Sequence, residues 1–490
     1  MAQTTRRIGR RFPDYGWAWP TGQLDQLLKA ALLPDEAAAC RYAARWLDEN
    51  DIDAADFREH RLLAAISDRF GRKLADRAAY PRLVGLQKML WTKSRMAMRE
   101  AEPVLQAMAD GGIPVMLIKG ASRVALNAAA QRGRVAHDID ILVRPRDMVG
   151  AFDILRDSDW RIATGVSPQY LRTRLDSLRS MNFFKGSFGD IDLHQFGYDG
   201  SQSSTEDDAA IWDRVQAAQF SGVSVLIPSP ADRIALAIAH GGLDAHTHSD
   251  WLVDCAVTIQ QDEVDWEVFL DICARRRIAP AAAVALSYLS METGTPVPAM
   301  PLARVVEMAD RMGLSRWSSL LQAKPRTDFG KLVWLSRGVA KQLRLKRKKG
   351  RLRQAVPDVI WRGRPVRSDA RTTTALPALS QPIPCPDFGG DMTLDVTVRI
   401  DAPPVRRRIE MELNLGDRHI ARLRSTVLSR AGGLKVLRFH GRLILEEQNE
   451  PLRLEARPSR QFREWNDPGI VATYGALPFQ LLSAVFSPAS

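Results

Sequence analysis

The apolar residues of this 490-residue chain change their spacing near residue 390, and this change constrains the fold more than any other feature. Up to about residue 325 they recur mostly three or four residues apart, which is helical spacing. Further on they alternate with polar residues, as in strands with one buried and one solvated face. The alternation covers 392–400, 409–415, 437–445 and 452–456. The sequence therefore predicts an α+β protein with a C-terminal antiparallel, β-sandwich-like domain.

Shorter patterns divide the rest of the chain. Apolar runs between turn residues predict buried strands over 113–118 and 138–143, a helix over 146–157, and a hairpin of 180–185 with 190–196. The predicted regions are an N-terminal helical region (1–110), a mixed core (111–204), a helical domain (205–335), a basic segment and linker (336–386), and the β-sandwich-like domain (387–490).

The positive charge of the chain is concentrated in one segment. The net charge is +12, and residues 341–371 alone carry about +10, so the pI does not indicate a nucleic-acid-binding fold. The apolar stripe and basic run of 332–353 fit a solvated linker first, and peripheral contact with an anionic membrane second. Nucleic acid is the least favoured partner, because Trp334 and Trp361 flank the basic run and no aromatic residue lies inside it.

Neither a secretory signal nor an apolar run of roughly 18 residues is visible in the sequence. The expected location is therefore cytoplasmic. If residues 332–353 contact an anionic membrane, the protein would lie at the inner face of that membrane.

Two acidic residues begin the strand predicted at 138–143. Asp138 and Asp140 are two positions apart, so their carboxylates share one face of the strand while Ile139 and Ile141 anchor the other. Such a pair suits a divalent metal held against nucleotide phosphates, and without a cation the two charges repel each other. The alternative is a pair at an edge strand that faces water.

Two further features favour the metal site. The second strand of the predicted hairpin places Asp192 and His194 on one face, although a structural role for the histidine is the alternative. Upstream, Lys119, Gly120 and Ser122 open a helix directly after a buried strand. Free N–H groups, a small residue and a positive charge can receive a phosphate there.

The ordered series Lys119-Gly120, Asp138-Ile-Asp140 and Ile191-Asp-Leu-His194 resembles the uncharacterised nucleotidyltransferase family of the polymerase-beta-like superfamily. The resemblance covers roughly residues 20–300. It implies a polymerase-beta-like nucleotidyltransferase core at 111–204, embedded in helical regions, and it leaves the C-terminal sheet domain outside.

The resemblance also implies roles for individual residues. The catalytic and metal-binding carboxylates, holding Mg²⁺ or Mn²⁺, would be Asp138, Asp140 and Asp192. The nucleotide-binding residues would be Lys119, Gly120, Ser122 and Arg134. The residues behind the site or on its acceptor side would be His194, His240 and Asp254. Ala121 separates the glycine from the serine, where the superfamily commonly has Gly-Ser or Gly-Gly, so the hydroxyl contact departs from the family pattern.

The implied function is metal-dependent transfer of a nucleoside monophosphate from a nucleoside triphosphate, such as ATP, to a hydroxyl acceptor that the sequence does not specify. A glycosyltransferase is the alternative enzyme, because Asp-x-Asp also binds the metal of a nucleotide-sugar. Such enzymes usually place several strand–helix units before that motif, and here one strand and one helix precede it. The non-enzyme alternative is a transferase core that has lost its catalytic activity and acts as a scaffold or binding protein.

Overall fold

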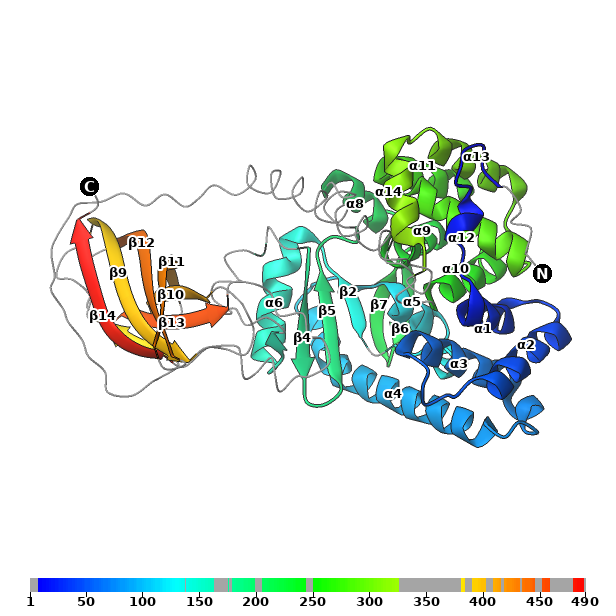
Figure 1. The fold of residues 1–490 in the computed structure, drawn as a ribbon, viewed down its shortest axis with the longest axis horizontal. Coiled ribbons are helices and arrows are strands. Elements are labelled where there is room, and N and C mark those ends of the chain that lie inside the picture. The colour runs from blue at the N-terminus through cyan, green and yellow to red at the C-terminus, as the bar shows by residue number, and fades with distance from the viewer. Residues whose placement is uncertain are drawn as a thin grey trace. The chain divides into compact units, whose positions relative to one another are not determined.

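The computed structural model describes residues 8–136, 138–162, 175, 179–198, 205–243, 250–325, 380–383, 390–401, 409–415, 418–431, 434–445, 452–458 and 479–488 (Figure 1). The basic segment 332–353, interpreted as a solvated linker first and as a peripheral membrane contact second, lies outside these residues. The chain forms two compact units, and residues 352–490 belong to the second. None of the helices in the described part is long and apolar enough to cross a bilayer.

The N-terminal region is helical, as predicted. Its α-helices are α1 (Gly22–Leu32), α2 (Glu36–Glu49), α3 (Phe57–Phe70) and α4 (Tyr80–Asp110). Helix α3 begins at a capping box, in which the Asp56 carboxylate accepts from the Glu59 N–H and the Glu59 carboxylate accepts from the Asp56 N–H. The apolar face of α3, including Leu62, Leu63 and Ile66, is buried in the core that α1 also enters.

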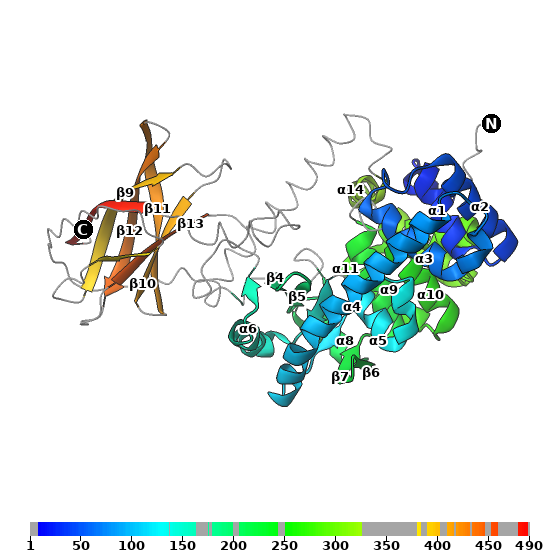
Figure 2. The same cartoon turned by 90° about the horizontal axis from the view of Figure 1, so that it is seen from below.

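A mixed seven-stranded sheet follows in the order β3-β4-β5-β2-β1-β7-β6. Its strands are β1 (Met116–Leu117), β2 (Ile139–Leu142), β3 (Arg161–Ile162), β4 (Ser180–Lys185), β5 (Gly189–His194), β6 (Gln216–Phe220) and β7 (Val223–Ile227). The predicted hairpin is confirmed as β4 and β5. Helix α4 contacts β2, β5 and β7, and Figure 2 shows this long helix beside the sheet. Strand β2 runs parallel to β5, with Asp140 directly opposite Asp192.

The remaining helices of the first unit are α5 (Lys119–Leu126), α6 (Met148–Asp157), α8 (Thr205–Trp212), α9 (Pro230–Gly241), α10 (Asp250–Gln261), α11 (Trp266–Arg276), α12 (Ala279–Glu292), α13 (Ala299–Asp310) and α14 (Leu314–Ala323). Helix α5 follows β1 directly, and α10 contacts α5, α9 and α3. The start predicted for α9 is confirmed, because Ser229 caps it and Pro230 occupies its first turn.

The central sheet extends beyond the predicted core. Residues 205–335 were expected to be helical throughout, yet β6 and β7 form a hairpin there, and β7 pairs in parallel with β1. The hairpin turns at Ser221 and Gly222, both with positive φ (50° and 88°), which suits a two-residue turn. The strand predicted at 113–118 is also shorter than expected, because only Met116 and Leu117 pair with neighbours.

The C-terminal residues form one antiparallel sheet in the order β14-β9-β12-β11-β10-β13-β8. The strands are β8 (Ser380–Ile383), β9 (Gly390–Asp401), β10 (Ile409–Leu415), β11 (Arg418–Ala431), β12 (Leu434–Leu445), β13 (Leu452–Pro458) and β14 (Phe479–Pro488). Antiparallel pairing and the four predicted strands are confirmed. The two-sheet sandwich is corrected to a single rolled sheet, whose edge strands meet where the Gln381 amide donates to the Phe479 carbonyl at 3.1 Å.

Candidate active site

Two carboxylates and an imidazole converge at the centre of the sheet. The parallel pairing of β2 with β5 places Asp140 beside Asp192, and His194 follows two residues later on the same face. His194 Nε2 lies 3.1 Å from Asp140 Oδ1 and 2.8 Å from Asp192 Oδ2. One ligand atom from each residue lies within 4.8 Å of the other two, so the three could hold one metal ion. The two carboxylates supply the oxygen ligands that Mg²⁺ and Mn²⁺ prefer, so they fit the ion that the family resemblance implies, whereas an imidazole is not a typical ligand of Mg²⁺.

Lys119 supplies the positive charge next to these carboxylates. Its Nζ lies 2.5 Å from Asp140 Oδ1, and its backbone has a positive φ of 54° at the start of α5. A non-glycine residue in this region stores strain that the surroundings must hold in place. The strained backbone is thus found at the residue whose side chain reaches the carboxylates.

The pKa directions agree with this pairing. Burial alone would lower the pKa of Lys119, but the charges of Asp140, Asp192 and Asp138 outweigh it and raise the pKa. Burial alone would raise the pKa of Asp140, but the Lys119 charge and the His194 hydrogen bond lower it. The carboxylates were expected to lack a compensating charge without metal. Lys119 provides that charge within the protein.

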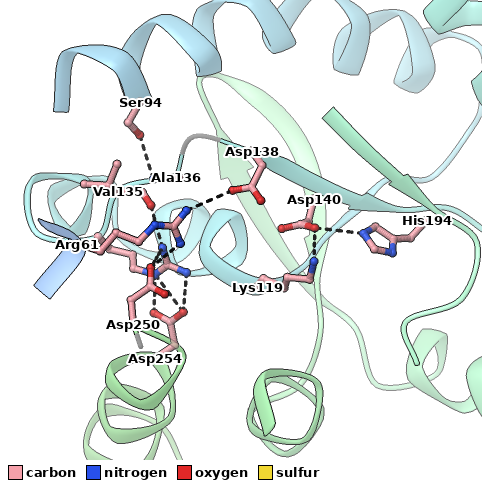
Figure 3. Close-up of polar contacts among 11 residues, drawn as sticks. Arg61, Ser94, Lys119, Val135, Ala136, Asp138, Asp140, His194, Asp250 and Asp254 are labelled. Carbon is pink, nitrogen blue, oxygen red and sulfur yellow. Dashed lines mark hydrogen bonds and ion pairs between the residues drawn. The ribbon is translucent and has the colours of Figure 1, made fainter. Parts of the chain in front are cut away.

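Asp138 lies apart from the three converging side chains. It stands just before β2, with 47% of its side chain exposed, and its closest basic neighbour is Arg61, at 3.8 Å between Asp138 Oδ1 and the guanidinium. Figure 3 draws Asp138 between Arg61 and Asp140. The sequence predicted a triad of Asp138, Asp140 and Asp192, whereas the geometry groups the last two with His194.

The turn at the start of α5 departs from the predicted phosphate site in one respect. The Ser122 hydroxyl donates to the Lys119 carbonyl at 2.7 Å, and Ser122 is almost fully buried.

The packing around Gly120 also requires a glycine at this position. A Cβ at this position would come within 2.5–2.8 Å of three guanidinium atoms of Arg134. Close approach of the arginine therefore requires a residue without a side chain.

Arg134 is the centre of a buried ion-pair network. Its Nε and one terminal nitrogen donate to Asp254 at 2.9 Å, and the other terminal nitrogen lies 2.6 Å from Asp250 and donates to the Val135 carbonyl at 2.8 Å. All three guanidinium nitrogens are thus engaged by the protein. Asp254 was expected behind the site or on its acceptor side, and its contacts with Arg134 tie α10 to the loop before β2.

Two residues at this site were not predicted from the sequence. Arg61, on α3, donates to Asp250 at 2.9 Å, and Asp250, at the start of α10, also forms an ion pair with Arg134. Nothing local marks Arg61, because it precedes two core leucines on an ordinary amphipathic helix. Asp250 belongs to the acidic and histidine-rich stretch before α10, which was the available signal.

A cleft opens over these side chains. It is lined by Arg61, Lys119, Gly120, Arg134, Ala136, Asp138, Asp140, Ala237, His240, Gly241, Asp250, Trp251 and Asp254. His240 is exposed in the last turn of α9, so it can reach a ligand in the cleft. The cleft brings together residues from α3, α5, β2, α9 and α10. The cleft therefore brings together most of the predicted site residues, whereas Ser122, Asp192 and His194 do not line it.

A mixed sheet that carries paired carboxylates on adjacent strands, beside a strand-to-helix turn with a lysine, is the arrangement expected of a nucleotidyltransferase core. Residues 57–291 match the model of the family described as uncharacterised nucleotidyltransferase. The match begins with α3 and ends in α12, so it includes every residue of the cleft. No curated protein and no solved structure matches the chain significantly.

The close approach of Arg134 to Gly120 predicts that a methyl group added at residue 120 destabilises the fold. We expect Gly120→Ala to lower the free energy of unfolding by about 1–3 kcal/mol, because the guanidinium is held by two carboxylates and cannot move away freely. Urea unfolding would measure the loss. Gly85→Ala is the matched control: Gly85 lies within α4, and its added Cβ would meet nothing within 4 Å. Equal stability of the two variants would contradict this interpretation of Gly120.

Proposed function

We propose that this chain is a metal-dependent nucleotidyltransferase, which moves a nucleoside monophosphate from a nucleoside triphosphate to an acceptor hydroxyl. The observation that carries the proposal is the register of β2 and β5, which sets Asp140 directly opposite Asp192 with Lys119 bound to the first of them. The match of residues 57–291 to the nucleotidyltransferase family model supports the class of reaction. In this reaction the acceptor oxygen forms a bond to the α-phosphorus, the bond to the bridging oxygen breaks, and pyrophosphate leaves.

The metal would be held by Asp140 and Asp192, with Asp138 adding a third carboxylate from the start of the same strand and His194 orienting the first two. A bound Mg²⁺ or Mn²⁺ would neutralise phosphate charge and polarise the α-phosphate. The fit rests on the donor chemistry of the converging side chains. His194 Nε2 lies within hydrogen-bond distance of both carboxylates, so it can hold them at a constant separation.

The other residues have roles that follow from their positions. Lys119 is bound to Asp140, and an incoming phosphate offers its ammonium a second anionic partner. Gly120 lines the cleft at the start of α5, where free backbone N–H groups can receive a phosphate. Asp192 can accept the proton of the acceptor hydroxyl as the new bond forms. His240, exposed at the cleft, lies where an acceptor can enter.

The proposal predicts nucleotide binding that depends on a divalent ion and on one carboxylate of β5. Isothermal titration with each ribonucleoside triphosphate and Mg²⁺ should detect binding of at least one of them, and EDTA should abolish it. Asp192→Asn should remove metal-dependent binding and turnover. Asp190→Asn is the matched control, because Asp190 lies two residues earlier on the same strand and outside the three-residue cluster.

Two outcomes would count against the proposal. If the wild-type chain binds none of the triphosphates, the result would favour a catalytically inactive core that serves as a scaffold. Full activity of Asp192→Asn, combined with loss of activity in Asp190→Asn, would show that Asp190 and not Asp192 is the catalytic carboxylate of β5.

A further inference from the structure

Arg61 reaches the cleft from a helix outside the strands that carry the motifs. It lies in the second turn of α3, and its guanidinium lines the cleft together with Lys119 and Asp138. The side chain is held in place on two sides. One terminal nitrogen donates to Asp250 at 2.9 Å, and the guanidinium carbon lies 4.7 Å from the centre of the Phe57 ring. A cation stacked on an aromatic ring and bound to a carboxylate is well oriented before any ligand arrives.

Arg61 differs from Arg134, the other arginine of the cleft, in the donors it retains. Every guanidinium nitrogen of Arg134 is engaged by the protein, and Lys119 is bound to Asp140. The second terminal nitrogen of Arg61 lies 3.8 Å from Asp138, which is too far for a hydrogen bond. Within the described part of the chain its Nε has no hydrogen-bond partner. Arg61 therefore keeps donors for an anionic ligand.

The charges behind Arg61 also favour an anion. Three guanidinium groups, those of Arg61, Arg123 and Arg134, share the two carboxylates of Asp250 and Asp254 within the described residues. A third carboxylate, Asp138, lies 3.8 Å from Arg61 and is about half exposed, so it offsets the third guanidinium charge only in part. The same carboxylate oxygen, Asp250 Oδ2, accepts from Arg61 and forms an ion pair with Arg134, so the two arginines share one negative charge. A phosphate group would balance the remaining charge.

The position of Arg61 indicates which phosphates it would meet. Asp138 lies between Arg61 and Asp140 in the site (Figure 3). The reacting α-phosphate has to lie at the metal-binding carboxylates, Asp140 and Asp192. A guanidinium on the far side of Asp138 is displaced from that point, so the phosphate group that it could contact is not the reacting one.

We propose that Arg61 binds the β- and γ-phosphates of the nucleoside triphosphate, and that the Arg134–Asp250 pair positions it for this contact. The inference rests on the proposed function. It means that a residue of the N-terminal helical region binds the phosphates of the nucleotide. Bidentate contact between a guanidinium and phosphate oxygens would stabilise the bound triphosphate and the pyrophosphate as it departs. Tight binding would then require α3 to remain packed against α10.

The test compares ligands that differ only in their phosphates. Isothermal titration with Mg²⁺ would measure the affinity of Arg61→Gln for the triphosphate that the wild type binds, for the matching monophosphate, and for inorganic pyrophosphate. We expect the triphosphate and pyrophosphate to bind about 10- to 100-fold more weakly, which is the usual effect of losing a hydrogen bond to a charged group. The monophosphate should bind within about twofold of wild type, because it lacks the groups that Arg61 contacts.

Two variants separate this role from a structural one. Arg61→Lys keeps the charge but loses the planar pair of donors, so it should bind the triphosphate with intermediate affinity and provides a folded variant if Arg61→Gln fails to fold. Arg69→Gln is the matched control. Arg69 lies two turns later on α3, donates to the Ala30 carbonyl at 3.1 Å, and does not line the cleft, so its loss should affect stability and leave all three affinities unchanged.

The outcomes distinguish the inference from the function on which it rests. A wild-type chain that binds no triphosphate overturns both. A wild-type chain that binds, with Arg61→Gln equally tight, overturns only the role of Arg61. Equal weakening for monophosphate and triphosphate would show that Arg61 acts on the shape of the site, and this result would also overturn the proposal.

Discussion

Asp140→Asn should abolish nucleotidyl transfer and also destabilise the fold. Loss of a metal-binding carboxylate removes several kcal/mol of transition-state stabilisation, so turnover should fall roughly 1,000-fold or more. The free energy of unfolding should fall by about 3 kcal/mol, because Asp140 is buried and its loss removes the partner that lies 2.5 Å from the buried Lys119 ammonium. Labelled-nucleotide transfer and urea unfolding would measure the two effects.

Asp138→Asn is the matched control, because the two acids lie two residues apart. The side chain of Asp138 is about half exposed and has only a long contact with Arg61, so its loss should change stability by about 0.5 kcal/mol or less. Both variants should lose activity if both carboxylates bind metal. Equal stability of the two variants would contradict the assigned Lys119–Asp140 pair. Retention of full activity by Asp138→Asn would remove that residue from the metal site.

Arg134→Met should produce the largest loss of stability. Arg134 is 6% exposed and is bound to Asp250 and Asp254, which are themselves mostly shielded from water. Removing the guanidinium leaves these carboxylates without their main partner, and breaking a buried ion pair in this way costs about 3–5 kcal/mol. Urea unfolding would measure the cost. Nucleotide affinity should fall as well, since Asp250 then binds Arg61 alone and α10 loses its tie to the loop before β2.

Two further variants test whether the effect comes from the ion pairs. Arg123→Gln removes a more exposed arginine with one 3.2 Å contact to Asp254, and it should cost about 1 kcal/mol or less. The double variant Arg134→Met with Asp254→Leu should be less destabilised than the sum of its single changes, because it leaves one fewer unpaired charge. Strict additivity would show that Arg134 and Asp254 do not stabilise each other.

Local patterns were sufficient for much of the architecture. The helices before residue 110, the hairpin of β4 and β5, and four of the C-terminal strands follow from apolar spacing, because each buries one face against a core. The β6–β7 hairpin was missed, since Ser221-Gly222 is a weaker turn signal than Asn-Gly and the flanking strands have five residues each. The single rolled C-terminal sheet was also missed, because alternation predicts a strand and not its neighbours.

The sequence by itself determined which residues could hold a metal and a nucleotide, because the i and i+2 spacing of acids on strands and a lysine-glycine turn before a helix are local properties. Only the tertiary structure decided which charges meet. Arg61 and Asp250 are 189 residues apart in sequence, and Arg134 and Asp254 are 120 apart. Lys119 pairs with Asp140 because β1 lies antiparallel to β2, and Asp140 meets Asp192 because β2 lies parallel to β5. Burial makes these pairings selective, since a charge removed from water is stable only beside its partner.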